Sequence, residues 1–141
     1  MKEEGTRRAV AIWLRILRLA NTKSSLMGER LRARNLSPAQ FDVIAQVGSA
    51  NGLSQRDLAG RLVVTEGNVT QLLDKLEKQG LVTRHTEGRC NRLGLTAQGR
   101  RLYDKVVPEQ DSLIAKRFSV LDDREQEELR RLLRKLSRSN E

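Results

Sequence analysis

Three polar side chains with hydrogen-bonding heads recur at helical spacing near the middle of the chain. Asn68, Gln71 and Lys75 occupy positions i, i+3 and i+7, so a helix through them carries all three on one face. Asn and Gln amides can pair with the N6/N7 edge of adenine in the major groove, and a lysine can contact a phosphate. This face is therefore predicted to lie against double-stranded DNA. A second interpretation stays open, in which Asn68 caps the helix locally and Gln71 faces solvent.

The helix that presents this face is expected to run from a threonine cap to a glycine stop. Thr65 can cap it, and a glutamate follows in the first turn, where the helix dipole favours a carboxylate. Gly80 ends it because glycine adopts the left-handed cap conformation at little cost. Gly67 and Thr70 flank the polar face, and together with Thr65 they are further candidates for DNA contact. The buried side is expected to consist of Val69, Leu72, Leu73 and Leu76.

Two shorter helices are predicted before this one. Ser37, Pro38 and Gln40 form a strong start signal, with a cap, a proline at the first helical position and a capping box. Ser54 opens the second helix in the same way. Ser54 and Gln55 then stand at a helix start, where backbone N–H groups and a hydroxyl can hold a phosphate. Capping alone explains Ser54 equally well.

The sequence pattern changes after Gly80, where residues 81–96 are too broken by glycines for a helix. Two short antiparallel strands are expected, joined by a turn over residues 86–89. Arg89 is the best candidate for a minor groove, whose negative potential attracts arginine. A solvated basic turn is the alternative, and for the single histidine a solvent-facing strand position is favoured over a DNA contact. The basic candidates in this segment are Arg84, His85, Arg89 and Arg92.

Long helices with apolar stripes are predicted at both ends of the chain. Residues 7–34 carry apolar side chains at helical spacing, and residues 97–119 and 122–138 form another pair. The last helix begins with a capping box of Asp122 and Glu125. The apolar surface of these terminal helices is larger than the surface needed to cover the central helices. Dimerisation through both ends of the chain is therefore predicted. The alternative is that they fold back on their own domain.

Charge and composition agree with an anionic partner. The chain has 141 residues, which fits one domain, and 32% of them are charged, with a net charge of +9. The charge is +6 over residues 1–36 but +1 over residues 37–99 and +2 over residues 100–141, so net charge alone does not locate a binding site. No stretch approaches the roughly 18 apolar residues of a membrane helix, and the N-terminus lacks a signal-peptide pattern. A cytoplasmic protein without a membrane partner is expected.

The sequence offers no chemistry for catalysis. One Cys and one His exclude an internal disulfide and a Cys/His zinc site within one chain. No spacing of His, Cys and carboxylates suggests a nucleophile, base or metal cluster, so neither an enzyme nor a cofactor is expected. Cys90 is interpreted as a small strand residue, whose oxidation would disturb DNA binding through bulk or charge.

Four runs of sequence, in order, resemble the MarR family of bacterial transcriptional regulators. They are LSPAQFDVIAQV, LSQRDLAGRL, TEGNVTQLLDKLEKQGLVTRH and RLGLTAQGRRL. The most specific part is LLDKLEKQGLVTR followed by the L-T-x-x-G segment of Leu95, Thr96 and Gly99. The resemblance implies a mostly α fold with a winged helix-turn-helix at residues 37–99, between dimerisation helices at 1–36 and 100–141. It also implies a homodimeric repressor whose DNA affinity often falls when a small molecule, frequently an aromatic acid, binds.

The family pattern extends to the wing and to an effector site. An acidic residue two positions before an arginine is typical of the family's wing tip, and Glu87 and Arg89 occupy those places. This hairpin looks shorter than usual, and Gly88 replaces a commonly basic residue. The family's ligand cleft suggests Trp13 as an effector-binding residue, although a lone Trp on an apolar helix face is usually core or interface. A winged-helix protein–protein module without DNA binding is the alternative function.

Overall fold

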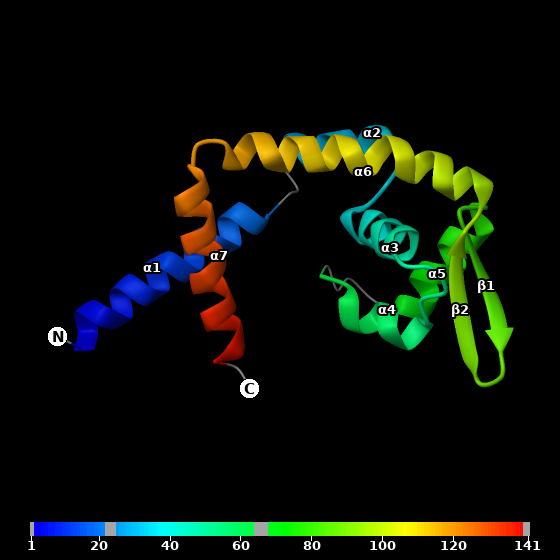
Figure 1. The fold of residues 1–141 in the computed structure, drawn as a ribbon, viewed down its shortest axis with the longest axis horizontal. Coiled ribbons are helices and arrows are strands. Elements are labelled where there is room, and N and C mark those ends of the chain that lie inside the picture. The colour runs from blue at the N-terminus through cyan, green and yellow to red at the C-terminus, as the bar shows by residue number, and fades with distance from the viewer. Residues whose placement is uncertain (1, 22–24, 64–67, 140–141) are drawn as a thin grey trace. The chain divides into compact units, whose positions relative to one another are not determined.

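A computed structural model describes residues 2–21, 25–63 and 68–139. Within these ranges the chain forms seven helices and one antiparallel hairpin, which confirms the expected mostly α class (Figure 1). In chain order the elements are α1 (Lys2–Ala20), α2 (Leu26–Ala33), α3 (Pro38–Ser49), α4 (Gln55–Arg61), α5 (Val69–Lys78), β1 (Val82–Glu87), β2 (Cys90–Leu95), α6 (Ala97–Phe118) and α7 (Asp123–Arg138).

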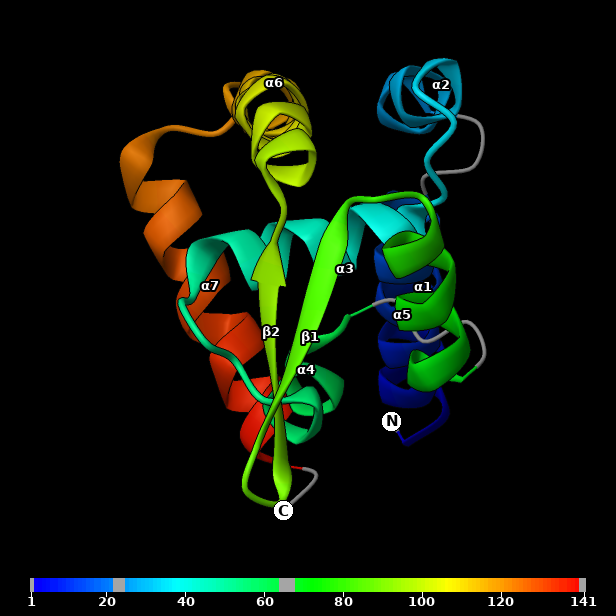
Figure 2. The ribbon, with the colours of Figure 1, turned by 90° about the vertical axis from the view of Figure 1, so that its right-hand side faces the viewer.

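Two compact units divide the chain, residues 1–105 and residues 106–141. The first contains α3, α4, α5 and the hairpin, which carry the candidate site (Figures 1 and 2). The second contains the end of α6 and all of α7. The expected organisation as one domain with boundaries near residues 36 and 99 stays a prediction.

The N-terminal segment is two helices, where the apolar spacing over residues 7–34 predicted one. The helix α1 ends at Ala20, and α2 begins after Ser25, whose hydroxyl accepts a hydrogen bond from the Gly28 N–H at 3.3 Å. The intervening sequence, NTKSS, is rich in residues that compete with the helix for backbone hydrogen bonds. Ser25 is a residue that can cap a helix, and it was the signal in the sequence for the start of a second helix.

The start of α3 follows the sequence prediction. The Ser37 hydroxyl accepts from the Gln40 N–H at 3.1 Å, and the Gln40 side chain accepts from the Ser37 N–H at 2.9 Å, which completes the capping box. A buried carboxylate on α3 also holds the chain beyond α4, because Asp42 accepts from the Val63 N–H at 2.7 Å. The loop that leads toward α5 is thus fixed to α3 at its upstream end.

The helix α5 begins at Val69, later than the sequence suggested. Asn68 is its N-cap, and the Asn68 side chain accepts a hydrogen bond from the Thr70 N–H at 2.8 Å. The prediction that Thr65 caps this helix is therefore wrong; Thr65 itself lies outside the described residues. Gly80 ends the helix as expected, with a φ of +74°.

One face of α5 packs into the core of the first unit. Leu73 and Leu76 are fully buried, while Val69 and Leu72 are half-buried. The side chains with less than 2% exposure come from five elements, so both strands of the hairpin and α3 to α5 share one core. They are Val43, Ile44, Leu58, Leu73, Leu76, Val82 and Leu93.

The first turn of α6 is pressed against the end of α5. The Thr96 hydroxyl donates to the Gly80 carbonyl at 2.6 Å and accepts from the Gly99 N–H at 2.9 Å. The Thr96 N–H donates to the Leu81 carbonyl at 3.1 Å. A Cβ at Gly99 would lie 2.0 Å from the same Leu81 oxygen, so only glycine permits this approach. The L-T-x-x-G segment is therefore a structural junction between α5 and α6.

The helices α1 and α7 leave apolar side chains exposed. Trp13 is 59% exposed on α1, and Leu136 is 56% exposed on α7. Neither helix has a buried residue. The capping box of Asp122 and Glu125 at the start of α7 is confirmed by hydrogen bonds of 2.8 and 3.0 Å.

Candidate nucleic-acid interface

The polar face of α5 is exposed along its length. Asn68, Gln71 and Lys75 are all exposed, whereas the leucines on the opposite side are buried. Asn68 serves as the cap, which was the alternative interpretation of this residue, but its side-chain amide N–H groups remain available as donors. The two functions are compatible because capping uses only the amide oxygen. A donor at the first turn of α5 and an amide one turn further are thus presented together.

Two of the candidate residues are joined across the α4–α5 pair. The Gln55 amide donates to the Thr70 hydroxyl at 3.0 Å. Gln55 lies at the first position of α4 and Thr70 in the first turn of α5, so this bond holds the starts of both helices together. Both side chains therefore have a positioning role inside the protein, in addition to any contact with a phosphate.

The hairpin is fastened to the start of α4. The Ser54 hydroxyl caps α4 by accepting from the Asp57 N–H at 3.0 Å. The backbone of Ser54 forms a bridge with Arg92 on β2, and the Arg92 guanidinium donates to the Gly52 carbonyl at 3.1 Å. Arg92 also lies 3.5 Å from the Glu87 carboxylate. Arg92 is thus engaged within the molecule, in a network that orients the hairpin.

A second arginine of the hairpin clamps α5. The Arg84 guanidinium, on β1, pairs with the carboxylates of Asp74 and Glu77, the latter at 3.2 Å. The hydrogen bonds that Arg84 donates, to Glu77 first and to Asp74 second, raise the pKa of Arg84, so it stays charged throughout the usual pH range. Its side chain is 20% exposed. Arg84 was a candidate for DNA contact, and its position instead favours holding α5 against β1.

The wing tip is tighter than the sequence suggested. The strands pair from Val82 with Leu95 to Glu87 with Cys90, so only Gly88 and Arg89 lie between them, where a turn over residues 86–89 was expected. Gly88 takes a φ of +64°, which suits the first position of a two-residue hairpin turn. Arg89 is exposed, and among the described residues it has no ion-pair or hydrogen-bond partner.

The three wing arginines therefore differ in their surroundings. Arg84 and Arg92 are bound to carboxylates and carbonyls of the protein, which leaves Arg89 as the wing arginine open to a partner. His85 is exposed opposite Arg92 in the strand register, and Cys90 is an exposed free thiol at the start of β2. His85 and Cys90 lie on the same face of the hairpin. Cys90 pairs with Glu87, which is two residues from His85 on β1, and both paired and alternate positions share a face.

Sequence reasoning missed the acidic residues that fix the site. In the sequence, Asp74 and Glu77 resemble ordinary surface charges of α5. Asp42 resembles a helix residue without a special role. Their partners Arg84 and Val63 come from other elements. One signal was present: two carboxylates at i and i+3, beside a strand with an arginine, are placed to share one guanidinium.

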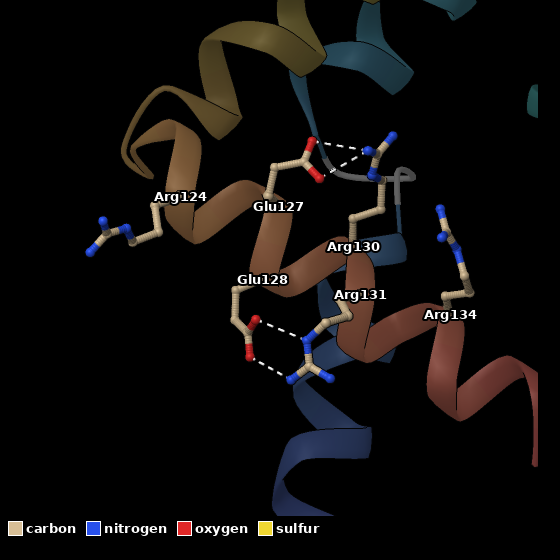
Figure 3. A pocket seen from close by; sticks show the side chains of 6 residues that line it. All are labelled: Arg124, Glu127, Glu128, Arg130, Arg131 and Arg134. Carbon is tan, nitrogen blue, oxygen red and sulfur yellow. Dashed lines mark hydrogen bonds and ion pairs between the residues drawn. The ribbon is translucent and has the colours of Figure 1, made fainter.

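Surface hollows in the second unit do not form an enclosed site. A hollow of about 520 Å³ is lined by Arg124, Glu127, Glu128, Arg130, Arg131 and Arg134. Figure 3 shows that all six project from α7, and that Glu127–Arg130 and Glu128–Arg131 form ion pairs of 2.9 and 2.7 Å. It is a furrow along one helix. Trp13, the residue predicted for an effector, does not line it.

Two further properties concern the described chain as a whole. No helix within the described ranges is both long and apolar enough to pass through a membrane. No group of three or more His, Cys, Asp or Glu side chains in the same ranges is close enough to hold a metal ion.

Comparison with known proteins gives one consistent family. The sequence profile of the MarR family matches residues 34–89, which span α3, α4, α5 and the start of the wing. An HTH-type transcriptional regulator from Bacillus cereus is 34% identical over 131 residues, which cover 92% of this chain and 89% of the relative.

Solved structures with the same fold support this result. A MarR family transcriptional regulator from Silicibacter pomeroyi superimposes with a TM-score of 0.76 at 28% identity, covering 96% of this chain and 97% of that one. NadR, crystallised with 4-hydroxyphenylacetate, has a TM-score of 0.72 at 28% identity, covering 90% and 91%. The arrangement of α3, α4, α5 and the hairpin is thus a winged helix-turn-helix.

Proposed function

The chain belongs to the MarR family of DNA-binding transcriptional regulators, and from this premise we propose that it is a homodimeric repressor of a pseudo-palindromic operator. The observation that carries the proposal is the exposed polar face of α5, set on a helix whose other face is locked into the core. Asn68 and Gln71 read base edges in the major groove, and Lys75 contacts a phosphate. A DNA-bound regulator of this kind acts in the cytoplasm of a bacterium.

The rest of the lobe positions α5 on the duplex. Ser54 and Gln55 present the start of α4 to the backbone, and Thr70, bonded to Gln55, keeps the two helix starts in register. Arg89 enters a flanking minor groove, with His85 on the adjacent strand as an additional contact. Arg84 and Arg92 act by holding the hairpin and α5 in place. Thr65 and Gly67, which lie outside the described residues, remain predicted contacts beside the start of α5.

Dimerisation is proposed through the terminal helices. Exposed apolar side chains on α1 and α7, among them Trp13 and Leu136, offer an apolar surface that a second copy would cover. A two-fold dimer places two copies of α5 in successive major grooves, about one helical turn apart. A pseudo-palindromic operator follows from that symmetry.

Release by a small ligand is also proposed. NadR, a relative of the same fold, has been crystallised with 4-hydroxyphenylacetate, which supports a small organic anion as the effector class. A ligand that alters the spacing of the two lobes would disturb their register on the operator. Trp13 remains the sequence's suggestion for a residue in such a site.

The alternative of a protein–protein module is less well supported. It requires an acidic or apolar exposed face on α5. The two carboxylates of α5 that face the hairpin are instead engaged by Arg84, and the outer face carries amides and a lysine. A wing tip with an unpaired arginine also fits a polyanion better than an apolar partner.

Selection of bound sequences from random duplex DNA by the purified protein tests the proposal. An inverted repeat is expected among the recovered duplexes, with half-sites about one helical turn apart. Failure to enrich any sequence would reject the sequence-specific regulator, and a single half-site would reject the two-fold arrangement.

The wing assignment is tested on the selected site with Arg89→Ala. Affinity should fall, and the slope of log K against log salt should decrease by about one unit. Arg124→Ala, on α7, removes the same charge outside the interface and should leave the slope unchanged. Equal slopes for Arg89→Ala and the wild type would remove the wing tip from the interface.

A further inference from the structure

The turn between α3 and α4 contains an asparagine followed by a glycine, Asn51 and Gly52. No other asparagine of the chain precedes a glycine. Both residues are exposed and lie outside the helices and strands. Gly52 has a φ of +69°, and apart from its chain neighbours nothing lies within 4 Å of the place that a Cβ would occupy. The main chain is therefore open beside the Gly52 nitrogen, where any other residue would carry a side chain.

The side-chain amide of Asn51 and the N–H of Gly52 are both free of hydrogen bonds. Within the part of the chain that the structure describes, the Asn51 side chain has no partner and the Gly52 N–H donates to no acceptor. Two other asparagines differ, because the Asn68 side chain caps α5 and the Asn91 side chain accepts from a threonine hydroxyl at 3.3 Å. An asparagine side chain is short enough to reach the backbone that follows it. The Asn51 carbonyl carbon can therefore turn toward the Gly52 nitrogen without breaking a contact.

We propose that Asn51 is a site of spontaneous deamidation, in which water converts its side-chain amide into a carboxylate and thereby lowers the affinity for DNA. The Gly52 backbone nitrogen loses its proton to solvent and attacks the side-chain carbonyl carbon of Asn51. A new C–N bond closes a succinimide ring, and the side-chain nitrogen takes up a proton and leaves as ammonia. Water then opens the ring at either carbonyl, which gives aspartate or isoaspartate. The net reaction consumes water and releases ammonia, without an oxidant or a cofactor.

Isoaspartate changes the main chain at a point where β2 holds the turn. In this product the main chain runs through the former side-chain carbon, so the path from the modified residue to Gly52 becomes longer. The next residues are fixed to β2: the Gly52 carbonyl accepts from the Arg92 guanidinium at 3.1 Å, and the Leu53 carbonyl accepts from the Leu93 N–H at 2.8 Å. Leu53 is also buried in the core. The added length therefore disturbs the contacts that orient the hairpin on the start of α4.

Both products also place a negative charge close to the start of α4. The modified residue lies three positions before Ser54. The effect on DNA rests on the proposed function, in which Ser54 and Gln55 face the phosphate backbone. A carboxylate at this edge of the interface repels the phosphates. Because the ammonia is lost to solvent, the reaction does not reverse, and the loss of affinity increases with the age of the molecule.

Peptide mapping by mass spectrometry after storage of the whole chain tests the site, with a reductant present so that Cys90 stays a thiol. Fragment spectra should place at Asn51 the mass gain that results when OH replaces NH2. The gain should appear faster at alkaline than at neutral pH, because the attacking nitrogen must lose its proton. The peptide that contains Asn68, which a valine follows, is the internal control and should keep its mass. Asn51→Gln retains an amide but must close a larger ring, so position 51 should show no gain in the same period. An unchanged mass at Asn51, or an equal gain at Asn68, would overturn the site.

The effect on DNA binding is tested separately on a selected duplex. Asn51→Asp reproduces one product and should lower the affinity by about 2- to 5-fold, the range for one added like charge at the edge of the interface. Fresh Asn51→Gln should bind as tightly as the fresh wild type, and on storage only the wild type should lose affinity, in proportion to the mass gain. If the wild type is converted but binds DNA unchanged, the effect on DNA is wrong and the modification site stands. If the fresh wild type binds no duplex at all, the proposed function fails while the mass result is unaffected.

Discussion

Replacing Gly99 with alanine is expected to break the junction between α5 and α6. A Cβ at this position would lie 2.0 Å from the backbone oxygen of Leu81. Ordinary van der Waals contact begins at 3.4 Å, so the two segments must separate by 1.4 Å (3.4 − 2.0). The obstacle is backbone, which cannot rotate aside as the end of a flexible side chain does.

The expected loss of stability follows from what that separation disrupts. Two hydrogen bonds cross the junction, from the Thr96 N–H to the Leu81 carbonyl at 3.1 Å and from the Thr96 hydroxyl to the Gly80 carbonyl at 2.6 Å. Each contributes about 1 kcal/mol, and overpacking adds a cost of roughly 1–3 kcal/mol. Alanine is favoured over glycine in a helix by about 1 kcal/mol, which offsets part of this. The free energy of unfolding should therefore fall by about 2–4 kcal/mol.

Urea unfolding followed by circular dichroism measures this change, at one fixed protein concentration because the proposed dimerisation would make stability depend on concentration. Gly60→Ala is the matched control. It lies in α4, where an added Cβ meets nothing within 4 Å, so the same substitution should be neutral or stabilising by up to about 1 kcal/mol. A Gly99→Ala protein as stable as the wild type would refute the argument from the close approach.

Three further changes test other parts of the molecule. Gln71→Ala should cost about 1–3 kcal/mol at a selected operator and little on scrambled duplex, and equal losses on both would count against base reading. Gly88→Ala forces a non-glycine residue to a φ of +64° and should lower the free energy of unfolding by about 1–2 kcal/mol in urea; an unchanged midpoint would contradict the turn geometry. The hydrogen bond from Arg131 lowers the pKa of Glu128, so this pair stabilises α7 above the ordinary pKa of 4.5 and is lost as the pH falls through the lowered value. Glu128→Gln should therefore lose less helicity than the wild type in an acid titration followed by circular dichroism, and identical curves would argue against the pair.

Features encoded by neighbouring residues were predictable from the sequence. The capping boxes at Ser37 and Asp122 and the glycine stop at Gly80 each depend on residues within one turn, and all three are present. The start of α5 was misjudged because Thr65 and Asn68 are both good caps, and local propensity does not decide between them. The break after Ala20 was hidden by an apolar pattern that continues on both sides of it.

Features that depend on distant segments were not predictable. The sequence places Arg84, Arg89 and Arg92 in one basic hairpin and favours Arg89 as the tip residue, but it does not show that Arg84 and Arg92 are engaged within the protein. Their difference arises because β1 packs beside α5 and β2 beside the start of α4, which brings carboxylates and a carbonyl to two of the three. The same holds for Gly99. This position requires glycine only because the Leu81 backbone oxygen occupies the place of a Cβ, and the sequence does not show where Leu81 lies.

The attachment of α5 separates what holds the helix from what it displays. Leu73, Leu76 and the carboxylates that pair with Arg84 fix the inner side, while Gln71 and Lys75 are exposed on the outer side. On the proposed function, substitutions at these outer positions alter the preferred operator without lowering the stability of the lobe. A lineage carrying this scaffold can acquire new target sites by single mutations, each free of a compensating change elsewhere.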